Sequence, residues 1–295
     1  MRWAHGRLGS MVAPRPHATE VLVEGLRFPE GPRWHDHLLV VSDMHAGRIV
    51  TVSEHGEVAT LAEIPGQPSG LGWDPEGHLM VVSMLDRRVL KFHTDGPHEF
   101  ADLSGLAPFH CNDMVVDAGG GAYVGNFGFD LDGGADAVPT VLLRVAPDGG
   151  VSVAATDVRF PNGSVITPDG RTLIVGETFG ARLTAWDIAP DGTLSNRRVW
   201  ADLEGAVPDG ICLDADGAVW SACPISGRVL RVLEGGVVTD VVTVDRRGAY
   251  ACMLGGADRR TLFVCTADAS DPARTEARRG AIETVRVEVP GAGRP

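Results

Sequence analysis

The sequence is nearly free of lysine and has no surplus of basic residues. Among its 295 residues Lys91 is the only lysine, beside 25 arginines, and the formal charge at pH 7 is −13. Proteins that bind nucleic acids or anionic membranes present a basic face that neutralises phosphate groups. We therefore expect neither nucleic acid nor a membrane as a partner. A divalent cation or a neutral small molecule is compatible with this charge.

Long apolar runs and paired cysteines are also lacking. No stretch reaches the roughly 18 apolar residues of a membrane-spanning helix, and residues 1–16 lack the apolar segment of a secretory signal. The five cysteines are odd in number and scattered, which favours reduced thiols and a cytoplasmic protein. We expect residues 1–18 to form a flexible tail, with Met1 or Met11 as the true start, and residues 291–295 to form a second tail.

The motifs of several enzyme classes are missing as well. The sequence has no G-x-S-x-G nucleophile elbow, no H-E-x-x-H zinc motif, no Walker lysine loop and no G-x-G-x-x-G fingerprint. These absences argue against α/β-hydrolases, zinc metalloproteases, P-loop NTPases and dinucleotide-dependent enzymes. We expect no organic cofactor.

Glycine is abundant, with 38 residues, and much of it lies in a repeated phrase. The phrase is a turn containing Asp or Gly followed by a short β-rich run, which is typical of hairpin strands. It occurs six times, at residues 34–42, 73–83, 116–126, 167–177, 213–223 and 256–266. Repeats of roughly 40–50 residues are typical of propeller blades. We predict an all-β fold, a six-bladed β-propeller of four-stranded antiparallel blades that occupies residues 19–290 as one domain.

A propeller also needs a device that closes its ring. Residues 20–26 precede the first repeat and resemble the outer-strand runs at 58–64 and 198–204. We predict that they pair with residues 282–287 and complete the last blade. This N-terminal strand would join the ends of the ring and remove two exposed sheet edges.

The loops that lead into the six predicted innermost strands carry a polar residue at a matching position in five cases. The six residues at this position are Glu30, Ser69, Asn112, Asn162, Asp209 and Cys252. Equivalent positions around one axis converge, and carboxylates and amides crowded there would lack partners. A divalent cation resolves this conflict, and oxygen ligands suit Ca²⁺ first, with Mg²⁺, Mn²⁺ or Zn²⁺ as alternatives. Simple turn capping by Asn and Asp is the competing interpretation.

The motifs FPEGPRW, HCND, FPNG and VPDG, carried on six predicted blades, resemble those of the SMP-30/gluconolactonase/LRE (regucalcin-like) family. The resemblance covers nearly the whole predicted propeller. It implies a metal-dependent hydrolase that opens lactones, with relatives that act on organophosphates or other esters. It also implies that Glu30, Asn162 and Asp209 bind the metal, and that Asn112, accompanied by Asp113, contacts the substrate or metal-bound water.

Two catalytic hypotheses follow from this assignment. Asp209 is the candidate base that takes a proton from a metal-activated water. The Asn112 amide is the candidate donor that stabilises the oxyanion. His110 stands where sugar-binding members of the family often carry arginine, which weakens the case for a sugar lactone, and it is a weaker candidate for assisting departure of the ring oxygen.

Residues 125–130 (GNFGFD) place Asn126, Phe127 and Phe129 near the predicted channel mouth. The two phenylalanines predict either an apolar acyl or ring substrate or ordinary packing between blades. Glu177 either faces the mouth and contacts the substrate or belongs to a surface loop.

Two further classes of function stay open. The first is a non-catalytic propeller that binds calcium or a ligand with the same polar ring. The second is a protein-interaction propeller without a metal. For the enzyme we expect a small lactone or ester as substrate and a chain that is a monomer or a homodimer.

Overall fold

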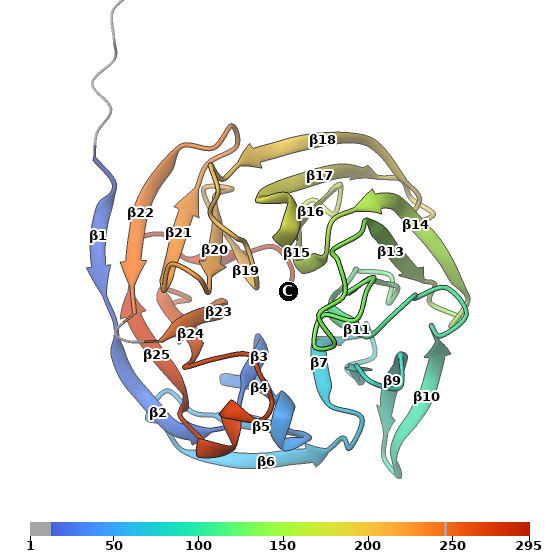
Figure 1. The fold of residues 1–295 in the computed structure, drawn as a ribbon, viewed down its shortest axis with the longest axis horizontal. Helices are drawn as coiled ribbons and strands as arrows, with labels where there is room; N and C mark the ends of the chain where they lie inside the picture. The colour runs from blue at the N-terminus through green and yellow to red at the C-terminus, as the bar shows by residue number, and fades with distance from the viewer. Residues whose placement is uncertain (1–12, 245–246) are drawn as a thin grey trace, which may run out of the picture.

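The computed structural model describes residues 13–244 and 247–295. Six sheets, each with a four-stranded antiparallel core, stand around a central channel, as Figure 1 shows. This arrangement confirms the predicted six-bladed β-propeller. The first five blades begin at the channel and run outward in chain order, and the sixth does so except that an N-terminal strand forms its outer edge. Successive repeats of the sequence therefore form successive blades.

The strands occupy four concentric positions. The innermost strands are β3 (Pro29–His35), β7 (Pro68–Trp73), β11 (Cys111–Val116), β15 (Pro161–Ile166), β19 (Ile211–Asp214) and β23 (Gly248–Gly255). The second strands are β4 (Leu38–Asp43), β8 (Leu79–Ser83), β12 (Ala122–Asn126), β16 (Thr172–Glu177), β20 (Val219–Cys223) and β24 (Thr261–Ala267). The third strands are β5 (Arg48–Val52), β9 (Arg88–His93), β13 (Thr140–Val145), β17 (Arg182–Ile188), β21 (Arg228–Val232) and β25 (Gly280–Arg286). The outermost strands are β6 (Val58–Glu63), β10 (Gly96–Asp102), β14 (Val151–Val158), β18 (Leu194–Asp202), β22 (Val238–Thr243) and β2 (Glu20–Leu26).

Burial follows these positions. The second strands are buried on both faces, because each blade packs against its two neighbours, and their sequences are accordingly rich in Val, Leu and Ile. The outer strand β6 is mostly exposed and contains Thr and Glu. Aromatic residues join adjacent blades, as where the rings of Trp34 and Phe263 stack with centroids 5.4 Å apart.

The ring is closed by the N-terminal strand. β2 pairs antiparallel with β25, with Glu20 opposite Thr284 and Leu26 opposite Gly280. The sixth blade therefore contains both ends of the propeller, which confirms the predicted closure. Figure 1 shows β2 in blue beside β25 in red.

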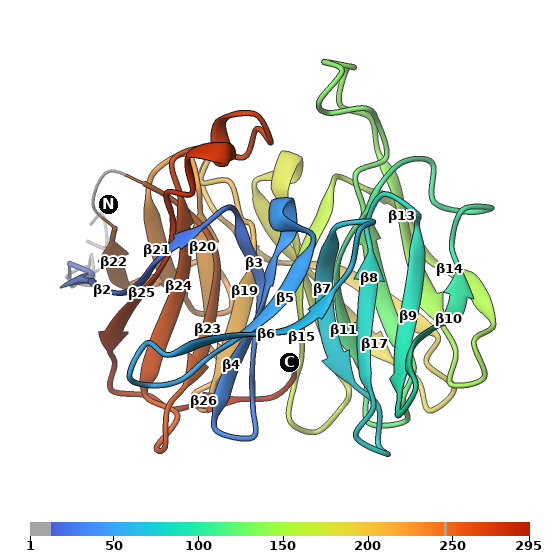
Figure 2. The ribbon, with the colours of Figure 1, turned by 90° about the horizontal axis from the view of Figure 1, so that it is seen from below.

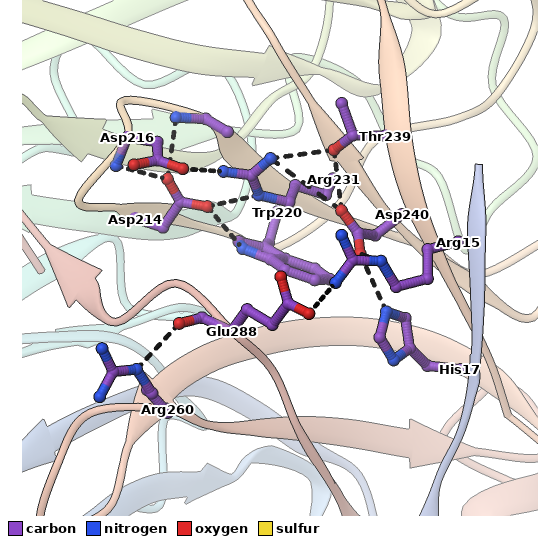
Figure 3. Close-up of polar contacts among 11 residues, drawn as sticks. Arg15, His17, Asp214, Asp216, Trp220, Arg231, Thr239, Asp240, Arg260 and Glu288 are labelled. Atoms are coloured by element: carbon purple, nitrogen blue, oxygen red, sulfur yellow. Dashed lines mark hydrogen bonds and ion pairs between the residues drawn. The ribbon is translucent and has the colours of Figure 1, made fainter. Parts of the chain in front are cut away.

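A second N-terminal strand lies where the sequence led us to expect a flexible tail. β1 (Arg15–Ala18) pairs in parallel with β22 and extends the fifth blade. A hydrogen bond and an ion pair accompany this strand pairing, because His17 Nε2 lies 2.9 Å from Asp240 Oδ1 and Arg15 Nη1 lies 2.5 Å from Glu288 Oε1, as Figure 3 shows. The rest of the predicted tail, residues 1–12, lies outside the described residues.

The C-terminal residues are also part of the sheet structure, in contrast to the expected tail. β26 (Gly291–Ala292) pairs with β19, with Ala292 opposite Leu213, and Arg294 forms an isolated bridge with Ile166. These contacts lie at the ends of β19 and β15. The C-terminal segment therefore joins the fourth and fifth blades at one end of the channel.

Three short 3₁₀ helices lie at the opposite end, at the top of Figure 2. They are η1 (Met44–Ala46), η2 (Thr178–Gly180) and η3 (Arg274–Ala277). No helix in the described part of the chain has the length and apolar character needed to cross a membrane.

Candidate active site

A cavity of about 660 Å³ opens at the channel end where the innermost strands begin. Four of the six polar-ring positions line it, namely Glu30, Asn112, Asn162 and Asp209. They come from blades one, three, four and five, which lie far apart in the sequence. The propeller ring brings them together, as the repeat alignment predicts.

A β-bulge occurs at the polar position in four of the innermost strands. The register shifts between Glu30 and Arg33, between Pro68 and Leu71, between Cys111 and Met114, and between Pro161 and Ser164. A bulge inserts unpaired residues and redirects a side chain away from the regular alternation of the strand. This explains how polar residues can occupy the beginning of strands whose other residues pack in an apolar core.

The glycine that follows the polar residue has a separate purpose. A Cβ on Gly163 would lie 2.4 Å from the backbone nitrogen of Ile211, and one on Gly70 would lie 2.3 Å from the nitrogen of Met114. In each case the close atom belongs to the innermost strand of the next blade. The P-x-G sequence therefore combines a polar side chain for the cavity with a residue small enough for adjacent strands to approach.

The carboxylates at this end of the channel are short of positive charge. Arg33, which is 3% exposed, donates from Nη2 to Asp113 Oδ1 at 2.6 Å and from Nε to the carbonyl of Leu71 at 2.8 Å. Asp113 thus has its own cation. Within residues 13–244 and 247–295, Glu30 and Asp209 take part in no ion pair.

This imbalance perturbs both groups. Burial, with repulsion from Asp113, raises the pKa of Glu30 to about 8, although the backbone N–H of Gly31 and the charge of Arg33 act against the rise. Burial and the nearby charge of Glu30 raise the pKa of Asp209 well above its ordinary value. Two buried carboxylates whose ionised forms are disfavoured by burial and by neighbouring negative charge indicate a place for a cation.

The donor set fits a hard divalent cation. The Asn162 amide donates from Nδ2 to Thr178 Oγ1 at 3.2 Å, and Thr178 donates to the carbonyl of Pro208 at 2.9 Å. Within the described ranges, no hydrogen bond reaches Asn162 Oδ1, which leaves this oxygen for another partner. Two carboxylates and an amide oxygen are the ligands that Ca²⁺ and Mg²⁺ prefer.

A second acidic cluster, in the β7–β8 hairpin, fits a cation less well. Potential ligand atoms of Asp74, Glu76 and His78 lie within 4.8 Å of one another. The Asp74 carboxylate already forms an ion pair with Lys91 and accepts from the backbone N–H of His78 at 2.8 Å. Burial opposes ionisation of Asp74, but these partners lower its pKa to about 2. Its charge is therefore balanced within the protein.

Asn112 and Phe127, both predicted to contact the substrate, line the cavity. Asn112 Nδ2 is buried and has no hydrogen-bond partner among the described residues. Buried amide groups are rarely left without a partner in native proteins, so this donor is available to a ligand. Phe127 stacks on Phe160, with ring centroids 4.7 Å apart.

Three other predicted contact residues, Asp113, His110 and Asn126, lie outside the cavity lining, as does Phe129, which was predicted either to lie near the mouth or to pack between blades. Asp113 is engaged with Arg33, and the His110 ring packs against Phe109 in a tilted arrangement with ring centroids 4.1 Å apart. Asn126 donates to the carbonyl of Val141 at 2.7 Å and accepts from Thr140 Oγ1 at 2.6 Å. Phe129 packs behind Phe160 and Phe179.

Glu177 is fully buried and differs most from its predicted place at the mouth. It accepts from the backbone N–H of Arg159 at 2.8 Å and from Arg182 Nε at 3.0 Å. In blade one, Asp43 makes the same contacts with the N–H of Arg27 at 2.8 Å and with Arg48. Both acids end the second strand of a blade and hold the loop that leads into its innermost strand. Glu177 therefore holds this loop in place and does not line the cavity, contrary to the prediction that it contacts the substrate.

The structure adds a second set of lining residues, of which the sequence had pointed only to Phe127. They share one place in the repeat, directly after the second strand of blades one to five. The apolar members of this set, which we call the rim, are Met44, Met84, Leu85, Phe127, Phe179, Pro224 and Ile225, and the polar residues His45 and Thr178 lie beside them. Alignment of the residues after the second strand of each repeat was the signal that could have found them.

Several known proteins resemble this chain in sequence and in fold. A family model described as the SMP-30/Gluconolactonase/LRE-like region matches residues 28–268. A 6-deoxy-6-sulfogluconolactonase of Pseudomonas putida is 29% identical over 278 residues, covering 90% of this chain and 93% of that protein. Pentonolactonase XacC of Haloferax volcanii is 27% identical over 256 residues, covering 84% of each chain. The crystal structure of regucalcin from Agrobacterium tumefaciens, a calcium-binding protein, has a TM-score of 0.79 at 22% identity and covers 96% of this chain and 99% of that one.

Proposed function

Since the chain belongs to the SMP-30/gluconolactonase/LRE-like family, we propose that it is a hydrolase that opens a lactone or a related cyclic ester. The observation that carries the proposal is the set of four polar residues in one cavity, with two carboxylates that lack a cation. The relatives named lactonases cover most of this chain and support the reaction class.

Glu30, Asn162 and Asp209 would hold one divalent cation, with Ca²⁺ as the first candidate and Mg²⁺, Mn²⁺ or Zn²⁺ as alternatives. Such an ion, when bound, polarises a carbonyl oxygen and makes a water molecule more acidic. The name of the calcium-binding structural neighbour supports a divalent cation as the bound ion.

The side chains supply the proton transfer and the charge stabilisation. An Oδ atom of Asp209 accepts a proton from the attacking water as the water oxygen bonds to the carbonyl carbon. Asn112 Nδ2, which has no partner among the described residues, donates to the carbonyl oxygen as it gains negative charge. The ring C–O bond then breaks, the ring oxygen takes the proton that Asp209 accepted, and the product is a hydroxy acid whose carboxyl group releases a proton to solvent.

The competing proposal is a propeller that binds a cation or a ligand without turnover. It is favoured by the same two carboxylates, because a cation site needs no catalytic base. A metal-dependent rise in thermal stability without hydrolysis of any lactone would select this alternative.

Hydrolysis measured by proton release across a lactone panel tests the proposal. We expect activity to be lost in chelator, restored by one divalent ion, and reduced by about 10²–10³ in Asn112→Ala, the range for removal of an oxyanion donor. Asp209→Asn should lower the rate at least as much, whereas Asp169→Asn, in an exposed turn, is the matched control. Full turnover by Asp209→Asn with metal bound would refute the base assignment.

A further inference from the structure

The rim suggests what the substrate carries beyond its lactone ring, and this inference rests on the proposed function. We infer that the substrate is a lactone with an apolar chain, and that the rim holds this chain while the polar residues of the cavity hold the ring. The chemical class is an alkyl-substituted γ- or δ-lactone rather than a polyhydroxylated sugar lactone.

The cavity is lined by residues from two different places in the repeat. Glu30, Asn112 and Asn162 are supplied by the bulged beginnings of innermost strands, and Asp209 by the residues just before β19. The loops after the second strands supply the rim, and its seven apolar members outnumber the polar residues of these loops that also line the cavity, namely His45, Asp132, Thr178 and Ser270. A ligand that reaches the polar residues with its carbonyl therefore has hydrocarbon beside its other end.

One side of the rim is built of phenylalanine rings that contact one another. Phe127 stacks on Phe160 at 4.7 Å, and Phe160 meets Phe179 edge-on at 5.2 Å. Phe129 supports both Phe160 and Phe179 from behind, at 5.9 and 5.6 Å. Four phenylalanines thus form a continuous wall that comes from the third and fourth blades.

Parts of the rim are exposed to water. Phe179 is 47% exposed and Ile225 is 83% exposed, although both line the cavity. Contiguous exposed apolar groups at a concave site are typical of ligand-binding grooves. An alkyl chain between them would remove this surface from water.

The described lining of the cavity contains no lysine or arginine side chain that could pair with an anionic substrate. A sulfonate, phosphate or carboxylate on the substrate would have no ion-pair partner there. Sugar hydroxyl groups placed against the phenylalanine side chains of the rim would lose their hydrogen bonds to water without replacement.

A homologous series of lactones tests the inference. The probes are γ-valerolactone, γ-heptalactone and γ-nonalactone, which differ only in the length of the alkyl chain, with glucono-δ-lactone as the hydrophilic comparison. We expect kcat/KM to rise with chain length by up to about fourfold per methylene, the factor for a fully buried methylene. Glucono-δ-lactone should be the poorest of the four.

Rim variants locate the effect. In Phe179→Ala combined with Ile225→Ser, the ratio of kcat/KM for γ-nonalactone to that for γ-valerolactone should fall by about tenfold or more. Val199→Ala is the matched control, because Val199 is 57% exposed on the outer strand β18, and the ratio should not change. A ratio that is equal in the rim variant and in the wild type would overturn the inference.

Binding of 5-alkyl-2-pyrrolidinones, lactams of the same shape that resist hydrolysis, separates failure of the two proposals. If short lactones are opened but chain length has no effect, or if glucono-δ-lactone is the best substrate, the inference is wrong and the proposed function stands. If no lactone is opened, the proposed function fails. In that case, tighter binding of longer lactams would still support an apolar site, and binding independent of chain length would overturn it.

Discussion

Replacement of Arg33 by methionine tests the packing beneath the candidate site. Arg33 lies in β3 of blade one and donates to the carbonyls of Leu71 and Met114 and to the carboxylate of Asp113. One side chain therefore ties together the innermost strands of the first three blades. Methionine keeps the length of the chain but removes the charge and every donor.

The expected loss of stability follows from the charge that remains. Asp113 is 6% exposed, and without Arg33 its carboxylate would be buried with no cation. Breaking a buried ion pair by removing one partner costs about 3–5 kcal/mol. At about 2–4 °C per kcal/mol for a chain of this size class, the melting temperature should fall by roughly 6–20 °C.

Unfolding followed by tryptophan fluorescence and by circular dichroism measures this loss. Combining Arg33→Met with Asp113→Asn should recover part of it, because the double variant leaves no unpaired charge. Arg279→Met is the control, since the Arg279 side chain is 72% exposed, and it should change stability by less than about 0.5 kcal/mol. A loss below about 1 kcal/mol in Arg33→Met, or no recovery in the double variant, would refute the reasoning.

Two other predictions concern parts of the fold away from this pair. Asp214→Ala should destabilise the fifth blade by about 3–5 kcal/mol in urea unfolding. The reason is that Asp214 accepts from Arg231 Nε at 2.7 Å and from Trp220 Nε1 at 3.0 Å (Figure 3). An unchanged unfolding midpoint would contradict this prediction. Burial, with the nearby Arg27, lowers the pKa of His45 to about 4. Between about pH 6.5 and 4 the unfolded chain therefore takes up a proton that the native state does not. The free energy of unfolding should fall by roughly 1–2 kcal/mol as the pH is lowered through this range. His45→Gln should flatten this part of the stability profile, and an equal pH dependence in the variant would show that other groups are responsible.

The fold could be predicted from sequence because the repeat is visible in it. Six turn-and-strand phrases indicate six blades, and the resemblance of residues 20–26 to outer strands indicates the closure. The strand at Arg15–Ala18 could not be found in this way, because long-range partners such as Asp240 and Glu288 fix its place. Such pairs leave no local pattern.

In the candidate site, too, residues in a recurring motif could be predicted from the sequence, and residues defined by long-range partners could not. The polar residues of the cavity occupy aligned positions in a recurring motif, so the sequence alone placed Glu30, Asn112, Asn162 and Asp209 at one end of the channel. Their roles stay predictions. The interpretation of Glu177 failed because its arginine partners come from other strands, and only the folded chain reveals that its charge is already neutralised.

The central claim is that this cavity opens lactones with a divalent cation held by Glu30, Asn162 and Asp209. The most direct measurement is the rate of γ-nonalactone hydrolysis as Ca²⁺ is titrated into protein stripped by a chelator. The account predicts a rate that starts at the uncatalysed background, rises with added ion and saturates at one ion per chain, with no rise in Glu30→Gln. Full turnover by the stripped protein in the presence of chelator would contradict it.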